Sequence, residues 1–238
     1  MKTIGIIGGM GPMATVDLME KIIQSTKAGD DQDHIHILVD NNTAIPDRTE
    51  AILHGGKSPV MELVRSGLNL ERMGADVLVL ACNTAHYFLP QVQPFLHVPV
   101  LNMIEVIANE CVESGMCCIG LLASEGTYGS GIYKKAFDKR GMKLLQPDKA
   151  QRQILHDMIY HGVKAGNRLY DVTEVCKVLS DMRSRGAKAF ILGCTEIPIA
   201  VKMYDIKETY IDATRILAEK VVAYVGAKCV VHDVNCAG

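Results

Sequence analysis

Two stretches of the chain decide its fold: Val77-Leu78-Val79-Leu80-Ala81-Cys82-Asn83-Thr84-Ala85-His86 and Ala189-Phe190-Ile191-Leu192-Gly193-Cys194-Thr195-Glu196-Ile197-Pro198. A short, continuous apolar run of this kind is typical of a strand buried on both faces of a parallel sheet. The polar residues after each cysteine favour a turn into a helix. Each cysteine is therefore expected at the carboxyl end of a buried strand.

The two cysteine stretches belong to a longer internal repeat. Ile4-Gly5-Ile6-Ile7 resembles Ile119-Gly120-Leu121-Leu122 in the second half of the chain. Gly11 and Gly126 are separated by the same interval as these two runs, and Cys82 and Cys194 by nearly the same interval. Because independent landmarks share almost one offset, a duplicated structural unit is indicated.

Strands and helices alternate along the rest of the chain. Strands are predicted over 3–8, 35–39, 76–81, 98–102, 117–123, 144–145 and the run before Cys194, and helices over 12–26, 59–73, 149–163, 171–185 and 212–226. We expect an α/β fold of two similar, doubly wound parallel-sheet domains related by a pseudo-twofold axis, with the active site in the cleft between them. The expected domains are 1–99 with 209–228, closed by the C-terminal helix, and 100–208, followed by a tail over 229–238.

Composition bounds the class of protein. The chain has 238 residues, of which 48% are hydrophobic and 22% charged, with a formal net charge of −2. A globular chain with an ample core is expected, without charge-driven binding to nucleic acid or to an anionic membrane. The first residues enter a predicted strand with no signal-peptide layout, and no apolar run reaches the length of a membrane span. A soluble, cytoplasmic protein is expected.

The eight cysteines do not suggest a disulfide scaffold or a metal site. Cys111, Cys117, Cys118 and Cys176 are grouped as cysteines in apolar or helical contexts, and Cys229 and Cys236 lie in the C-terminal tail. No CxxC pair or His/Cys cluster has the spacing of zinc ligands, so no metal is expected. Cys82 and Cys194 are left as the candidates for chemistry.

Two thiols that face one substrate suit proton transfer at a stereocentre. One thiolate takes a proton from one face of the carbon, and the opposite thiol delivers a proton to the other face. A helix that begins at each cysteine would stabilise the thiolate. Asn83, Thr84 and Thr195 can hydrogen-bond the thiolate or the substrate.

Two cations are candidates to anchor a substrate. Arg48 lies in a polar loop over 40–49, where its guanidinium could bind a carboxylate in a bidentate pair. Lys164 ends a predicted helix, where its ordinary role is to complement the helix dipole. Two cations would match a dicarboxylic substrate.

Two other functions stay open on the residues alone. Gly9-Met10-Gly11-Pro12-Met13-Ala14 fits the G-x-G-x-x-A turn of dinucleotide-binding proteins, and Asp40 ends the next strand, so an NAD-dependent oxidoreductase is one alternative. Against it, Pro12 follows the second glycine, inside the turn that must present N–H groups to pyrophosphate. A non-catalytic protein that closes on a dicarboxylate is the other alternative.

The sequence resembles the cofactor-independent aspartate/glutamate racemase family over about residues 3–225. The motifs that carry the resemblance are Gly-Gly-Met-Gly-Pro at 8–12, Asn-x-x-x-Ile-Pro-Asp-Arg-Thr at 41–49, Ala-Cys-Asn-Thr-Ala-His at 81–86 and Gly-Cys-Thr-Glu-Ile-Pro at 193–198. Met10-Gly11 stands where the glutamate racemase branch has an Asp-Ser pair, so the aspartate branch is favoured. Hydantoin racemases and maleate isomerases share the paired cysteines but match the loop at 47–49 and Lys164 less well.

The resemblance implies a function and a set of site residues. It implies interconversion of L- and D-aspartate, with glutamate as a further possible substrate, by two-base proton transfer in a homodimer that uses neither pyridoxal phosphate nor a metal. Cys82 and Cys194 would be the acid/base thiols. The implied substrate-binding residues are Met10, Arg48, Thr49, Asn83, Thr84, Thr127, Lys164 and Thr195, with Asp47 and Glu196 in support.

Overall fold

The structure, a computed structural model, describes residues 1–230. The chain forms two compact units, Met1–Ile107 together with the segment that begins at Thr214 (unit 1) and Ala108–Ala213 (unit 2). Each unit has its own sheet of four parallel strands. The expected α/β fold with two similar parallel sheets is confirmed, and the expected domain bounds stay a prediction.

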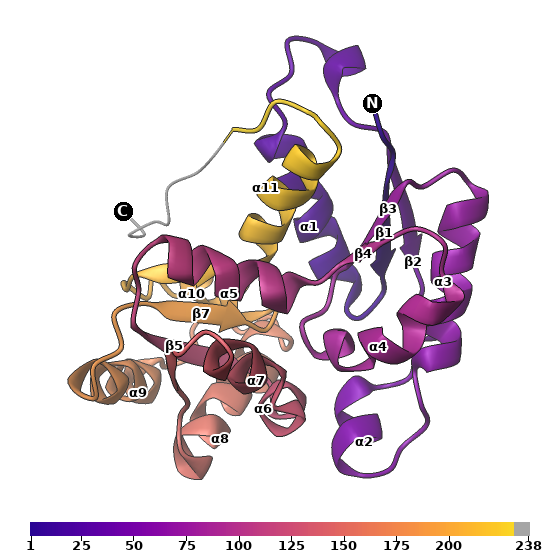
Figure 1. The fold of residues 1–238 in the computed structure, drawn as a ribbon. Coiled ribbons are helices and arrows are strands. Elements are labelled where there is room, and N and C mark those ends of the chain that lie inside the picture. Colours follow the sequence, from indigo (N-terminus) through magenta and orange to yellow (C-terminus); the bar gives the residue numbers. More distant parts are fainter. Residues whose placement is uncertain (231–238) are drawn as a thin grey trace. The chain divides into compact units, whose positions relative to one another are not determined.

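Unit 1 has the strand order β2-β1-β3-β4 (Figure 1). Its strands are β1 (Ile4–Gly8), β2 (Ile37–Asn41), β3 (Val77–Leu80) and β4 (Val100–Leu101). Its helices are α1 (Pro12–Ser25), η1 (Asp31–Asp33), α2 (Arg48–Leu53), α3 (Val60–Arg72), η2 (Thr84–Phe88), α4 (Leu89–Val92), η3 (Gln93–Phe95) and α11 (Ala213–Tyr224). The chain passes into unit 2 within α5 (Met103–Glu113).

Unit 2 repeats this order as β6-β5-β7-β8. Its strands are β5 (Cys118–Ala123), β6 (Lys143–Leu145), β7 (Phe190–Gly193) and β8 (Tyr210–Asp212). Its helices are α6 (Glu125–Ser130), α7 (Ile132–Asp138), α8 (Lys149–Asp157), η4 (Met158–Val163), α9 (Thr173–Ser184) and α10 (Ile197–Met203). The strand order matches that of unit 1 element for element, as the sequence repeat predicts.

The repeat extends to individual packing positions. Gly5 on β1 pairs with Leu78 on β3, and Gly120 on β5 pairs with Phe190 on β7. A Cβ atom at Gly5 would lie 2.5 Å from the Leu78 side chain, and one at Gly120 would lie 2.5 Å from the Phe190 ring. In both units the first strand therefore needs glycine because a large side chain of the third strand fills its place.

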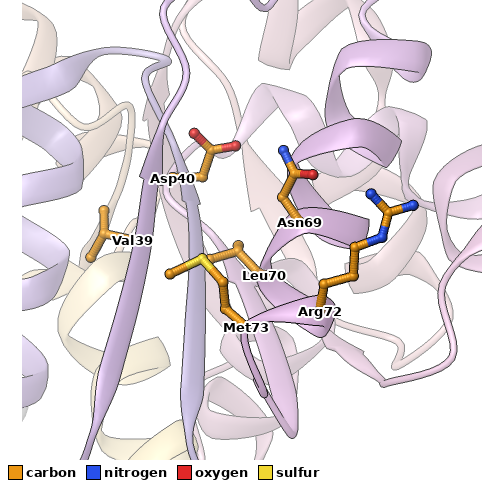
Figure 2. A pocket seen from close by; sticks show the side chains of 6 residues that line it. All are labelled: Val39, Asp40, Asn69, Leu70, Arg72 and Met73. Carbon is orange, nitrogen blue, oxygen red and sulfur yellow. The ribbon is translucent and has the colours of Figure 1, made fainter.

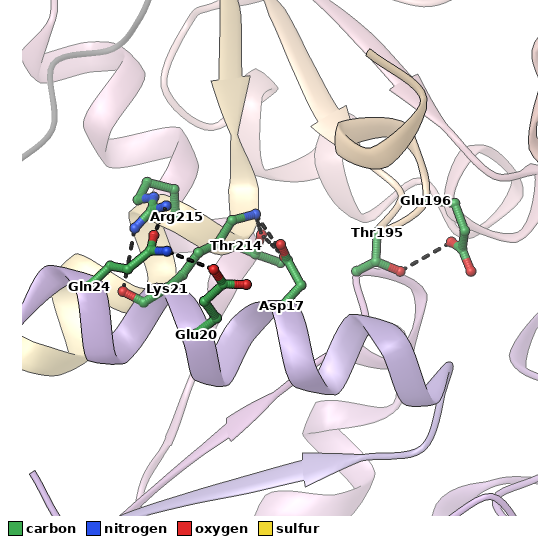
Figure 3. Close-up of polar contacts among 8 residues, drawn as sticks. All are labelled: Asp17, Glu20, Lys21, Gln24, Thr195, Glu196, Thr214 and Arg215. Carbon is green, nitrogen blue, oxygen red and sulfur yellow. Dashed lines mark hydrogen bonds and ion pairs between the residues drawn. The ribbon is translucent and has the colours of Figure 1, made fainter. Parts of the chain in front are cut away.

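Helices cover both faces of the sheet in unit 1, and Figure 1 shows α3 on one side with α1 and α11 together on the other. Leu78 and Leu80 share a buried apolar cluster with Leu63 and Leu70 of α3. Between α1 and α11, the buried Lys21 ammonium lies 2.7 Å from an Asp17 carboxylate oxygen and 2.6 Å from the Thr214 hydroxyl (Figure 3). The ion pair and the hydrogen bond compensate the Lys21 ammonium for the hydration that it loses on burial.

The structure corrects several details of the sequence-based expectation. The polar loop expected over 40–49 is shorter, because β2 continues to Asn41 and α2 begins at Arg48. Helices α2 and α5 and strand β8 were not expected. The helix expected after Cys194 is α10, which begins at Ile197. In the expected tail, Cys229 forms an antiparallel bridge with Thr26, whereas Cys236 lies outside the described residues. Within residues 1–230, no helix combines the length and the apolar character needed to cross a membrane.

Candidate active site

Cys82 sits in a buried turn directly after the sheet of unit 1. The Ala81 amide donates to the Ile7 carbonyl at 3.0 Å, which extends the β1–β3 ladder by one residue. Cys82 is 7% exposed, and Asn83 and Thr84 after it are also buried. The expected helix follows this turn but is not continuous. The segment over 84–95 is divided into η2, α4 and η3, because prolines within it lack an N–H for continuous helical bonding.

A loop and a helix bring the predicted anchor Arg48 toward the Cys82 turn. Met10 belongs to the same buried cluster as Cys82, and the Arg48 Nη2 donates to the Met10 carbonyl at 3.0 Å. Arg48 Nη1 donates to the Pro46 carbonyl at 3.0 Å. The guanidinium therefore also links two stretches of backbone, a role that the sequence did not suggest.

Two further predicted residues lie on the same helix. Asp47 is the N-cap of α2 and accepts a hydrogen bond from the Glu50 amide at 2.9 Å. Thr49 lies in the first turn of α2, and this helix contacts η2, which follows the Cys82 turn. Unit 1 thus gathers Met10, Asp47, Arg48 and Thr49 around the segment that carries Cys82.

His86 holds the Cys82 turn through its backbone. The His86 Nδ1 lies 2.9 Å from the Cys82 carbonyl oxygen and 3.3 Å from that of Asn83, and its Nε2 accepts from the Met103 amide at 3.2 Å. The neutral tautomer with hydrogen on Nδ1 satisfies both ring nitrogens. Burial lowers the pKa of His86 to about 4, although nearby backbone carbonyls offset part of this shift. The imidazole is therefore neutral at physiological pH.

Cys194 sits in the equivalent turn of unit 2, with different polar neighbours. It follows Gly193, which pairs with Ala123, and it is partly exposed. The Cys194 thiol donates to Glu196 Oε2 at 3.0 Å. The Thr195 hydroxyl donates to the same oxygen at 3.1 Å, and Figure 3 shows this second contact. A carboxylate that already accepts the thiol hydrogen is suited to receive its proton.

Lys164 joins the same group of residues. Its Nζ lies 3.8 Å from Glu196 Oε1 and 4.2 Å from the centre of the Tyr160 ring. The lysine follows the π-helix η4, a rare geometry that often occurs at functional sites. Its side chain is 43% exposed, so the ammonium stays accessible to a ligand. Unit 2 thus brings Cys194, Thr195, Glu196 and Lys164 together.

Thr127 lies in the first turn of α6, after β5, and is buried. Its hydroxyl lies 3.2 Å from that of Ser124, the N-cap of this helix. Because β5 pairs with β7, Thr127 follows a strand next to the one that ends before Cys194. Thr127 thus lies at the same edge of the sheet as Cys194.

Sequence reasoning missed two residues of these groups. His86 stands in the quoted cysteine stretch but had no role, because its contact with Met103 joins positions 17 residues apart. Tyr160 precedes Lys164 by four residues, a spacing at which helical side chains meet, so a signal was present in the sequence.

Other residues of the chain lie directly against the glycine turn at 8–12. The Gly9 amide donates to the Thr15 hydroxyl at 2.9 Å, and a Cβ atom at Gly9, where φ is +87°, would lie 2.3 Å from the Asn42 backbone. In dinucleotide-binding turns, the glycines serve a close approach by pyrophosphate. Here Gly9 instead allows the close approach of the backbone of residue 42, which disfavours the oxidoreductase alternative.

A separate surface hollow of about 430 Å³ lies between β2 and the end of α3 (Figure 2). It contains none of the predicted site residues. Its walls are formed by Val39, Asp40, Asn69, Leu70, Arg72 and Met73.

The chain is similar in sequence and in structure to known amino-acid racemases. The model of the Asp/Glu/hydantoin racemase family matches residues 7–221. The structure of Picrophilus torridus aspartate racemase is 33% identical with a TM-score of 0.84, over 97% of this chain and 96% of that one. The broad specificity amino-acid racemase RacX of Bacillus subtilis is 25% identical, over 92% of this chain and 96% of its own. Glutamate racemase from Francisella tularensis, solved with D-glutamate, is 18% identical with a TM-score of 0.65, over 94% of this chain and 81% of that one, and shares the fold.

The chain belongs to the Asp/Glu/hydantoin racemase family. It is an isomerase of the racemase class, and an amino-acid substrate fits that class.

Proposed function

We propose that this racemase interconverts L- and D-aspartate by two-base proton transfer, with Cys82 and Cys194 as the two acid/base thiols. The observation that carries the proposal is the equivalence of the two cysteines. Each lies within two residues of the end of the third strand of a four-stranded parallel sheet, and the two sheets have the same strand order. A racemase must run from either enantiomer, and a pair of equivalent thiols suits that requirement.

The surroundings of Cys194 support a proton-transfer role. The thiol donates to a Glu196 oxygen at 3.0 Å. Transfer of the thiol proton to this carboxylate would leave a thiolate, which is the base that abstracts the α-proton of the substrate. The Lys164 ammonium at 3.8 Å from the other oxygen balances the carboxylate charge. The same ammonium would pair with one carboxylate of the substrate.

The surroundings of Cys82 support the binding of an anion. Arg48 lies in unit 1 next to Met10, whose side chain packs in the cluster that contains Cys82. The guanidinium Nε makes no hydrogen bond among the described residues and is buried. In the proposal, a second carboxylate of the substrate would satisfy this donor. A substrate with two carboxylates would use both Arg48 and Lys164.

The chemistry explains why such cations are needed. Removal of the α-proton of an amino acid leaves a carbanion next to a carboxylate, and positive charge fixed nearby stabilises it. In the proposal, Arg48 and Lys164 supply this charge and hold the α-carbon within reach of the thiols. The homodimer and the lack of pyridoxal phosphate rest on the family resemblance, whereas the cytoplasmic location and the lack of a metal also rest on the sequence pattern.

The test is a panel of pure enantiomers. Both enantiomers of aspartate, glutamate, alanine and lysine are incubated with the protein, and product is separated by chiral chromatography. The proposal predicts rapid conversion of both aspartate enantiomers, slower conversion of glutamate and little of the other two. Faster conversion of alanine or lysine than of aspartate would refute the proposed substrate class.

A further inference from the structure

We infer that His86 is a positioning residue for the Cys82 thiol, which it holds through the backbone carbonyl of Cys82. The inference rests on the proposed role of Cys82. It starts from the contacts of the ring, because Nδ1 lies 2.9 Å from the Cys82 carbonyl oxygen and 3.3 Å from that of Asn83. A donor shared by two successive carbonyls fixes the peptide plane after Cys82, and with it the direction in which the side chain leaves the backbone.

The other ring nitrogen anchors the histidine to a second element. Nε2 accepts the Met103 amide, which is the first residue of α5. The next two amides of this helix donate to the Asn102 side chain, at 3.0 Å from Ile104 and 3.3 Å from Glu105. His86 and Asn102 together satisfy the start of α5, so the imidazole bridges a fixed helix end and the cysteine turn.

The ring is suited to position a thiol and unsuited to carry its proton. It is 3% exposed and uses both nitrogens for backbone groups. Burial holds its pKa near 4, so it stays neutral while the enzyme works. A neutral ring keeps Nε2 free to accept the Met103 amide, whereas a protonated ring would oppose that amide.

The sequence repeat shows that unit 2 has no counterpart of His86 at the aligned position. When Cys82 is aligned with Cys194, His86 falls on Pro198, which has no donor and lies in the first turn of α10. Near Cys194 the carboxylate of Glu196 contacts the thiol itself. His86 therefore serves Cys82 alone, and its loss is expected to slow the proton transfers at Cys82. Because two enantiomers have equal free energy, kcat/KM falls equally in both directions, and the isotope effect reveals which thiol is affected.

The first arm of the test needs no substrate. Alkylation of Cys82 and Cys194 by iodoacetamide is followed in the same molecules by peptide mass spectrometry. The carboxamide of His86→Gln reaches the Nε2 position and so loses the hydrogen bond to the Cys82 carbonyl. Because a loss of about 1.4 kcal/mol corresponds to a factor of ten, the rate of Cys82 alkylation is expected to change about tenfold. His86→Asn, whose carboxamide reaches the Nδ1 position, is expected to keep the Cys82 rate, and neither variant changes the Cys194 rate.

The second arm uses aspartate deuterated at the α-carbon. In His86→Gln, kcat is expected to fall about tenfold at an unchanged KM, and the primary isotope effect to rise for one enantiomer only. In His86→Asn, kcat and the isotope effect are expected to stay at their wild-type values. His36→Asn, a change at an exposed histidine of unit 1, serves as the matched control.

Three outcomes would overturn the inference: an unchanged Cys82 alkylation rate in His86→Gln, equal changes at both cysteines, or an isotope effect that rises equally for both enantiomers. If the wild-type protein converts no amino acid, the proposed function fails while the alkylation arm still decides the role of His86.

Discussion

The Cys82 turn and the Cys194 turn occupy equivalent positions in two sheets of the same strand order, yet their polar surroundings differ. Cys82 is buried, and its turn is held through the backbone by a neutral imidazole. Cys194 is partly exposed and donates directly to a carboxylate that an ammonium also contacts. A duplicated scaffold thus carries two thiols that are matched in placement but supported by different physical means.

The difference maps onto aligned positions of the repeat. With the two cysteines aligned, Glu196 falls on Thr84 and Pro198 falls on His86. Each unit therefore supports its thiol with a residue type that the other unit lacks at the aligned position. Two thiols with different support are expected to respond differently to pH and to mutation, and the experiments below test that difference.

The largest effect is expected from the thiols themselves. In the proposed mechanism, Cys82→Ser and Cys194→Ser each lower kcat for aspartate racemisation at least about 100-fold, because a positioned acid/base group contributes about 10²–10⁴-fold. Steady-state polarimetry measures the change. Cys176→Ser, at an exposed cysteine of unit 2, is the control and is expected to leave kcat unchanged. A wild-type kcat in either active-site variant would remove that thiol from the mechanism.

The buried imidazole is expected to couple stability to pH. The pKa of His86 falls from 6.5 to about 4 on folding, so the unfolded chain binds this proton more readily. The stabilisation is complete above pH 6.5 and is lost as pH falls toward 4. Between pH 7 and pH 4, the wild type should lose about 3 kcal/mol more of its free energy of unfolding than His86→Asn does. Urea denaturation at both pH values measures this difference. Parallel losses would contradict the burial of a neutral ring.

The carboxylate at Cys194 is expected to matter for rate. Glu196→Gln keeps the size of the side chain but removes the charge that accepts the thiol hydrogen. A hydrogen bond to a charged group is worth about 1.5–3 kcal/mol, so kcat should fall about 10- to 100-fold. Iodoacetamide should alkylate Cys194 more slowly, with Cys82 as the reference in the same molecules. Glu174→Gln, which breaks an exposed ion pair with Lys177, is the matched control. Unchanged alkylation of Cys194 would show that Glu196 does not act on the thiol.

The smallest effects test the scaffold that the two turns share. Gly5→Ala and Gly120→Ala each place a Cβ atom 2.5 Å from a side chain of the third strand. Overpacking of this kind costs about 1–3 kcal/mol. Because the two sites are equivalent, the losses should be similar, with faster amide hydrogen exchange in the unit that carries the change. A cost at one glycine only would mean that the two sheets do not share this packing.

The fold was largely predictable from the sequence because buried parallel strands leave continuous apolar runs. Nearly equal offsets between similar runs in the two halves predicted the duplicated sheet, and the structure has it. Short elements escaped prediction for a physical reason. Strand β8 has three residues and α2 has six, and such segments are stabilised by tertiary packing more than by their own pattern.

The site was predictable in part. The cysteines and Glu196 are close in sequence to the strand ends that carry them, so local pattern located them. The bond from Met103 to His86 and the bonds that Arg48 makes to Pro46 and Met10 depend on where distant loops meet. Sequence pattern does not encode that meeting, so the linking role of Arg48 came only from the structure.

The most direct test of the two-thiol account is hydrogen exchange at the α-carbon in deuterated water. Each aspartate enantiomer is incubated separately with the wild type, Cys82→Ser and Cys194→Ser, and deuterium at the α-carbon is measured by NMR or mass spectrometry. The account predicts that the wild type labels both enantiomers, and that each variant loses exchange from a different one. Wild-type exchange in both variants, or loss of the same enantiomer in both, would contradict it.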